Sequence, residues 1–166
     1  PIELRVPIEV QESMQSDCSE LRTLEPKAML GRMTEEEVSC IESRISGSRQ
    51  VVEKDKLSRV LMANAFASGD TRHLTLLRRH LEQIDRSDPD LAYKYAYALH
   101  KEGASQAKEV VRWSQTALDG KSKWTGGTYQ RRVYTTMKMR AVAAYQLWES
   151  AEKDYATQPT PRRAML

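Results

Sequence analysis

The 166-residue sequence is poor in the residues that most often mark a chemical site or a membrane segment. It contains two cysteines, three histidines and one phenylalanine. No apolar run approaches the roughly 20 residues that span a bilayer, and no GxSxG, GxxxxGK or GxGxxG motif occurs. We therefore expect no transmembrane helix, no cofactor, no metal ion and no catalytic role.

The few histidines are too far apart to form a metal site. His73 and His80 are seven residues apart, which is two turns of a helix, whereas zinc-binding histidines on one helix are usually four apart. His100 has no histidine or cysteine near it in the sequence. We expect all three to be polar surface residues.

The two cysteines, Cys18 and Cys40, are too far apart for a CxxC redox motif and lack the histidines of a zinc site. A disulfide or two buried free thiols remain. A simple hairpin would place Cys40 opposite Leu24, so a disulfide requires the first segment to break at Pro26 and fold back. We expect that disulfide, which would stabilise the fold by about 3 kcal/mol. It would indicate an oxidising periplasmic or envelope location, with the cytoplasm as the alternative.

Positive charge is concentrated in the last third of the chain, although the net charge is only +3. Residues 1–107 have 15 basic and 18 acidic side chains, a net of −3, and residues 108–166 have 11 and 5, a net of +6. Such a region could bind nucleic acid, anionic lipid or an acidic protein partner. A solvated helix face followed by a flexible basic tail at 156–166 is the simpler explanation, and no nucleic-acid-binding motif accompanies the charge.

The apolar pattern predicts an all-α fold. Residues 1–10 alternate as in a β-strand, but no second strand is available, so we expect an extended N-terminal arm over residues 1–15. From residue 16 onward the apolar positions recur every three to four residues, which is typical of helices. In the last helix, the apolar stripe that we expect to be buried consists of Tyr129, Val133, Met137, Ala141, Ala144, Leu147 and Trp148.

Local signals predict where several helices begin and end. The segment TEEE predicts a capping box between Thr34 and Glu37. Asp88 followed by Pro89 predicts a cap and a first helical residue. Gly31 is expected just after the end of a helix.

Two helical hairpins repeat at an interval of 34 residues, because Leu57 and Leu91, Ala65 and Leu99, and Gly69 and Gly103 all share that separation. A single short hairpin cannot bury its apolar face, whereas stacked hairpins bury a continuous core. In this period, and in the segments AFASGD and ALHKEGASQAKEVVRWSQTAL, the sequence resembles the tetratricopeptide repeat family. It departs from the family pattern where leucine replaces the usual tryptophan near the start of each unit.

The resemblance implies an α-solenoid of antiparallel helical hairpins with six to seven helices. A single domain would cover residues 16–155, with repeats at about 51–85 and 86–120 and capping helices at 17–46 and 128–155. Solenoids bind partners along a concave face built from the first helix of each unit. On that basis we expect a protein or peptide partner to contact Asn64, Lys94, Tyr95, Arg131 and Arg132.

The function expected from these features is a non-catalytic interaction module or scaffold. The segment DCSELRTLEP, followed by such repeats, also resembles helical-repeat proteins of bacterial envelopes, particularly those associated with myxobacterial gliding motility, which implies a subunit of an envelope assembly. Two alternatives remain. One is a ligand-binding or enzymatic domain that uses the loop at 124–132, and the other is a basic surface that binds anionic lipid or nucleic acid.

Overall fold

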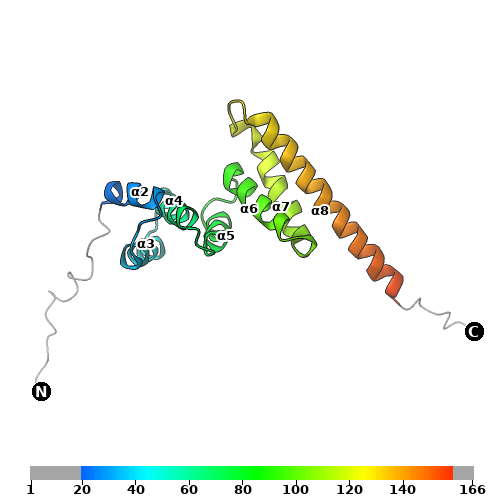
Figure 1. Cartoon of the computed structure of the whole chain (residues 1–166), viewed down its shortest axis with the longest axis horizontal. Helices are drawn as coiled ribbons and strands as arrows, with labels where there is room; N and C mark the ends of the chain where they lie inside the picture. The colour runs from blue at the N-terminus through cyan, green and yellow to red at the C-terminus, as the bar shows by residue number, and fades with distance from the viewer. Residues whose placement is uncertain (1–19, 159–166) are drawn as a thin grey trace, which may run out of the picture. The chain divides into compact units, whose positions relative to one another are not determined.

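The computed structural model describes residues 20–158 and shows an all-helical chain (Figure 1). Seven α-helices and two short 3-10 helices occupy the described range, and no strand occurs in it. This confirms the all-α class, whereas the solenoid arrangement stays a prediction. The expected arm at 1–15 and most of the expected tail lie outside the described residues. The chain divides into two compact units, with the boundary between Leu76 and Leu77; the single domain over 16–155 stays a prediction.

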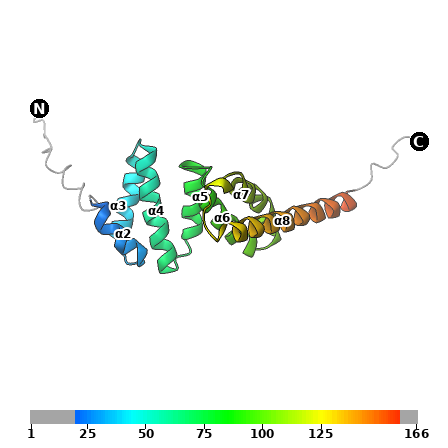
Figure 2. The same cartoon turned by 90° about the horizontal axis from the view of Figure 1, so that it is seen from above.

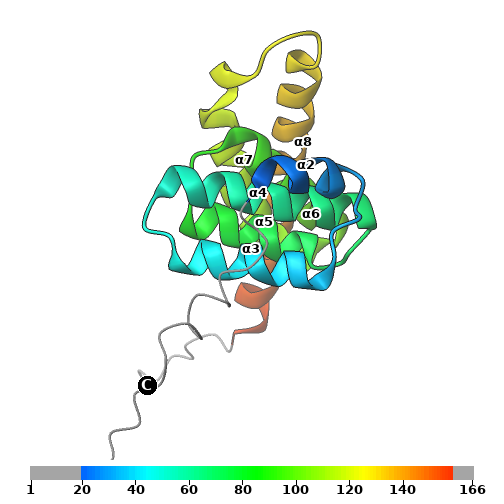
Figure 3. The ribbon, with the colours of Figure 1, turned by 90° about the vertical axis from the view of Figure 1, so that its left-hand side faces the viewer.

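The first unit contains α2 (Leu21–Met29), α3 (Glu35–Gly47) and α4 (Val51–Ser68), followed by the start of α5 (His73–Gln83). Both α2 and α3 pack against α4, and Figure 3 shows these three helices in blue to cyan-green. Their apolar side chains form one buried cluster, whose members are Leu24, Ala28, Ile41, Ile45, Leu57, Val60 and Leu61.

The turn between α2 and α3 is fixed by short-range contacts. The predicted capping box is present, since Thr34 Oγ1 accepts a hydrogen bond from the Glu37 amide and the Glu37 carboxylate accepts one from the Thr34 amide. Gly31 follows the end of α2 with a φ of +65°. An added Cβ at Gly31 would lie 2.6 Å from the backbone nitrogen of Ser68, so the turn approaches α4 too closely for any side chain.

Pro26 does not break the first helix, contrary to our expectation. It lies inside α2, where it removes one backbone hydrogen bond. Leu24 and Ala28, on either side of it, are almost fully buried in the core of the first unit. Their burial outweighs the local cost of the proline, which is about 3 kcal/mol in a helix interior.

The second unit contains the rest of α5, α6 (Pro89–Lys101), α7 (Ala107–Asp119) and α8 (Tyr129–Thr157). Short 3-10 turns at Ala104–Gln106 and Lys121–Lys123 connect the last three helices. Helix α7 packs against both α6 and α8. The predicted cap of α6 is confirmed, because Asp88 Oδ1 accepts hydrogen bonds from the backbone amides of Asp90 and Leu91 at 2.9 and 3.0 Å.

The expectation that His80 lies at the surface is wrong, because this residue is fully buried. Phe66, in the segment AFASGD, is 76% exposed, and its ring meets that of His73 edge-on with the two centroids 6.1 Å apart. Helix α8 also continues through Thr157, so the first two residues of the expected flexible tail are helical.

Candidate protein-binding surfaces

Helix α8 has two apolar faces, and the structure covers only one of them. The covered face contains Thr136, Met139 and Ala143, which are buried where α8 packs against α7 and α6. Thr136 is accommodated there because its hydroxyl donates a hydrogen bond to the carbonyl of Arg132 at 2.7 Å. Small and flexible side chains on this face allow the helices to pack closely.

The second face of α8 lies on the opposite side of the helix and is exposed. Its residues recur at alternating intervals of three and four over three heptads, and we call them the α8 seam: Tyr134, Met137, Ala141, Ala144, Trp148, Ala151 and Tyr155. The four large side chains are 69%, 57%, 54% and 81% exposed in chain order. Figures 1 and 2 show the C-terminal part of α8 running past the ends of α6 and α7.

The apolar stripe expected for this helix mixed the two faces. Met137, Ala141, Ala144, Leu147 and Trp148 were expected to be buried, but all five are exposed. The residues that are buried instead include a threonine and an alanine, which carry little hydrophobic signal. The spacing of the seam is that of the a and d positions of a coiled coil, where each helix buries such a face against another helix.

The expected contact residue Arg132 is engaged within its own unit. Its guanidinium forms an ion pair with Asp90 across from α8 to α6. It also lies over the rings of Tyr93 and Trp124, 5.7 and 6.0 Å from their centroids. Trp124 is buried and contacts Tyr93 edge-on. These contacts give Trp124, in the expected 124–132 loop, and Arg132, in the first turn of α8, a packing role.

The other expected contact residues differ in their exposure and contacts. Tyr95 is only 6% exposed and packs edge-on against Trp113 at 6.0 Å, so its ring belongs to the core, and burial raises the pKa of its hydroxyl. Asn64 is half-buried, and its Oδ1 accepts a hydrogen bond from the Met33 amide at 3.1 Å. Lys94 and Arg131 are exposed. Asn64 lies in the first unit and the other four residues lie in the second.

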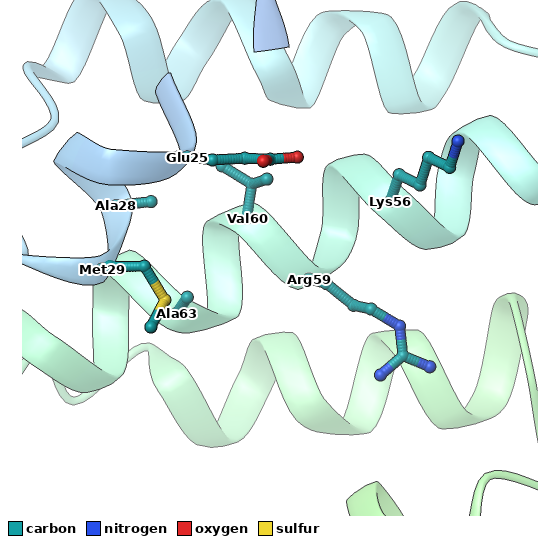
Figure 4. A pocket seen from close by; sticks show the side chains of 7 residues that line it. All are labelled: Glu25, Ala28, Met29, Lys56, Arg59, Val60 and Ala63. Carbon is teal, nitrogen blue, oxygen red and sulfur yellow. The ribbon is translucent and has the colours of Figure 1, made fainter. Parts of the chain in front are cut away.

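A shallow hollow lies between α2 and α4 in the first unit, with a volume of about 360 Å³. Figure 4 shows its lining: Ala28, Met29, Val60 and Ala63 are apolar, and Glu25, Lys56 and Arg59 are charged, with Lys56 and Arg59 together at one end. Met29 is largely exposed. The hollow is open to solvent and is lined by both apolar and charged side chains.

Glu37 and Glu53 in the first unit have lowered pKa values, and each forms an ion pair. Hydrogen bonds from Arg44 and then Ser48 lower the pKa of Glu53. A hydrogen bond from Lys27 and another from the Thr34 amide lower that of Glu37. These pairs join α2, α3 and α4 to one another, which is a structural role. Among residues 20–158, no group of three metal-binding side chains is clustered.

Cys40 lies half-buried on α3 against the core of the first unit. Cys18 lies outside the described residues, so the predicted disulfide between them stays a prediction. The fold-back at Pro26 through which we expected the two cysteines to meet is not formed.

Comparison of the chain with protein-family models, curated proteins and solved structures gives no match. In the described part of the chain, no helix has both the length and the apolar composition needed to cross a bilayer. Residues 20–158 thus form an all-α protein that exposes the apolar α8 seam.

Proposed function

We propose that this chain is a non-catalytic protein–protein interaction module that binds a partner helix along the α8 seam. The observation that carries the proposal is the exposed apolar heptad pattern on the side of α8 that faces away from its own core. Soluble proteins rarely expose a continuous apolar face of this kind unless it is a binding surface. A partner helix would bury the seam by inserting its own side chains between these residues.

We further propose that the helices form degenerate tetratricopeptide-like repeats. Support comes from two glycines 34 residues apart. Gly69 has a φ of +69° at the end of α4, and Gly103 has a φ of +97° after the end of α6. Both positions favour glycine because a left-handed backbone strains other residues. The ψ values of the two glycines differ, at 23° and −165°, so the support for the repeat is the positive φ that Gly69 and Gly103 share after the end of a helix.

The cellular setting that we propose is a bacterial cell-envelope assembly, such as one that acts in gliding motility, in which this chain is a subunit. This rests on the two cysteines and on the sequence resemblance alone. Cell fractionation combined with non-reducing peptide mapping tests it. A Cys18–Cys40 cross-linked peptide in the envelope fraction is the expected result, and reduced cysteines in the cytoplasmic fraction would contradict it.

Site-specific photo-crosslinking tests the proposed binding surface. A photoreactive residue replaces Trp148 on the seam in one variant and Lys108, an exposed residue of α7, in the control. We expect a protein adduct from position 148 when the protein is irradiated in the cells that produce it, and none from position 108. The proposal fails if position 148 gives no protein adduct although the variant is folded and abundant.

A further inference from the structure

We propose that the partner on the α8 seam is the same helix of a second copy of this chain, bound antiparallel about a two-fold axis near residue 146. This inference rests on the proposed function and names the occupant of its surface. Two properties of the seam carry it: the charges along its edges and the sizes of the side chains within it.

Four exposed charged residues flank the seam on its two edges. Lys138 and Glu152 occupy equivalent heptad positions on one edge, and Arg140 and Asp154 do so on the other. Within residues 20–158, none of these four side chains has an ion pair with the rest of the chain. Each edge thus has a cation and, 14 residues or about 21 Å further along, an anion. This separation is too long for a pair within one helix.

An antiparallel partner brings these charges together. In antiparallel coiled coils the flanking positions of one edge face the same edge of the other helix. When the two-fold axis passes near residue 146, Lys138 faces Glu152 of the second copy, and Arg140 faces Asp154 of the second copy. Because the axis repeats each contact, a single alignment produces four ion pairs between the helices.

The same alignment also matches side-chain size within the seam. Ala144 lies opposite Trp148 of the second copy, so the indole ring meets a position that leaves room for it. Met137 lies opposite Tyr155 of the second copy, and Ala141 lies opposite Ala151 of the second copy. Large residues therefore never meet at the centre, where two tryptophans would otherwise compete for one space.

Other arrangements of two α8 helices lose these matches. A parallel dimer in register places Trp148 against Trp148 and Tyr134 against Tyr134, and its flanking pairs are Arg140 with Tyr145 and Leu147 with Glu152, neither of them an ion pair. Shifting the antiparallel alignment by one heptad toward the N-terminus leaves a single kind of ion pair, between Arg131 and Glu152 of the second copy. Shifting it by one heptad toward the C-terminus leaves no ion pair at the flanking positions. The alignment about residue 146 is thus favoured by charge and by volume together.

Sedimentation equilibrium of the full chain over a wide concentration range tests the proposal. We expect the mass to rise from 19.0 kDa toward twice that value. Trp148→Glu should abolish this association. Lys138→Glu should weaken it by about tenfold, because two symmetry-related attractions become repulsions. Lys108→Glu, which makes the same charge change on the exposed surface of α7, is the matched control and should leave the association unchanged.

The decisive variant is the charge exchange Lys138→Glu with Glu152→Lys. It should restore the wild-type dissociation constant, because each new carboxylate again faces a lysine of the second copy. Failure of the exchange to restore association overturns the antiparallel alignment. A wild-type chain that stays monomeric at every concentration overturns self-pairing altogether. In that case, a position-148 adduct with a different polypeptide retains the proposed function, whereas the absence of any adduct removes both. Far-UV circular dichroism confirms that each variant keeps its helices.

Discussion

At the scale of single residues, Gly31 shows how one backbone position holds two helices together. It combines a φ of +65° with a close approach to Ser68. We predict that Gly31→Ala lowers the free energy of unfolding by about 2 kcal/mol or more, because it adds left-handed strain to a backbone clash. Urea unfolding followed by far-UV circular dichroism measures this. Intrinsic fluorescence is unsuited to the first unit, because every tryptophan and tyrosine of the sequence lies at position 93 or later.

Gly47→Ala is the matched control for that measurement. Gly47 is the last residue of α3, and an added Cβ there meets no atom within 4 Å. Alanine costs less conformational entropy than glycine in a helix, so this substitution should be neutral or stabilising by up to about 1 kcal/mol. An equal decrease in the free energy of unfolding for Gly31→Ala and Gly47→Ala would contradict the role assigned to Gly31.

Tyr95 and Lys94 are adjacent in the sequence and opposite in environment. Both were expected to contact a partner, yet Tyr95 is buried against Trp113 and Lys94 is exposed. We predict that Tyr95→Ala destabilises the second unit by about 3–5 kcal/mol, as truncation of a buried aromatic residue usually does, whereas Lys94→Ala changes stability by less than about 0.5 kcal/mol. Tryptophan fluorescence during urea unfolding measures both. A small effect of Tyr95→Ala would show that its ring is not part of the core.

The sequence alone could not separate these two residues. The segment YKYAY alternates tyrosine with smaller or charged residues, so an error of one position in the helical phase exchanges the buried and exposed sides. What decides the phase is the position of Trp113 on α7, which is distant in the sequence. Asn64 is a similar case, because its hydrogen-bond partner Met33 lies 31 residues away.

At the scale of helices and turns, the contacts of Glu53 at the corner between α3 and α4 predict that the stability of the fold depends on pH. Arg44 and Ser48 lower the pKa of Glu53 in the folded chain relative to 4.5. A carboxyl group with a lowered folded pKa contributes stability above its unfolded pKa and loses it as the pH falls through the folded value. The contribution of Glu53 should therefore be complete at neutral pH and decline below about pH 4.5.

The measurement is the urea midpoint, followed by circular dichroism, as a function of pH for the wild type and Glu53→Gln. The wild type should be more stable at neutral pH, and the difference should shrink on acidification, because only the wild type loses the interaction there. Glu149→Gln, at an exposed position of α8, is the control. A difference that stays constant down to pH 3 would show that the Glu53 carboxylate does not support the corner.

Helix ends were predictable from the sequence, and helix faces were less so. The capping box at Thr34 and the start of α6 at Asp88 depend on residues within four positions, so local chemistry determines them. Pro26 is an exception, because the packing of Leu24 and Ala28 overrides its local preference. The two faces of α8 could not be separated, because the face that the core covers is less hydrophobic than the face that it leaves exposed.

At the scale of the whole molecule, the two units have different compositions. The first unit is joined by ion pairs and a capped turn, and its helices carry no tyrosine or tryptophan. The second unit contains all of the tyrosines and tryptophans, part of them in its core and part of them on the α8 seam. The basic excess of the last third of the chain thus accompanies the proposed binding helix, where Lys138 and Arg140 have no ion-pair partner within residues 20–158 and would find acidic partners in the proposed second copy.

Self-pairing through α8 makes the thermal stability of the second unit depend on chain concentration. Only folded chains associate into the dimer, so a higher chain concentration favours the folded state. A tenfold increase should raise the melting temperature, followed by tryptophan fluorescence, by about 2–4 °C for a unit of this size. Trp148→Glu should melt at the same temperature at every concentration. Added salt should reduce the concentration dependence of the wild type, because the four ion pairs lie at the exposed edges of the seam. A wild-type melting temperature that is independent of concentration would contradict the dimer.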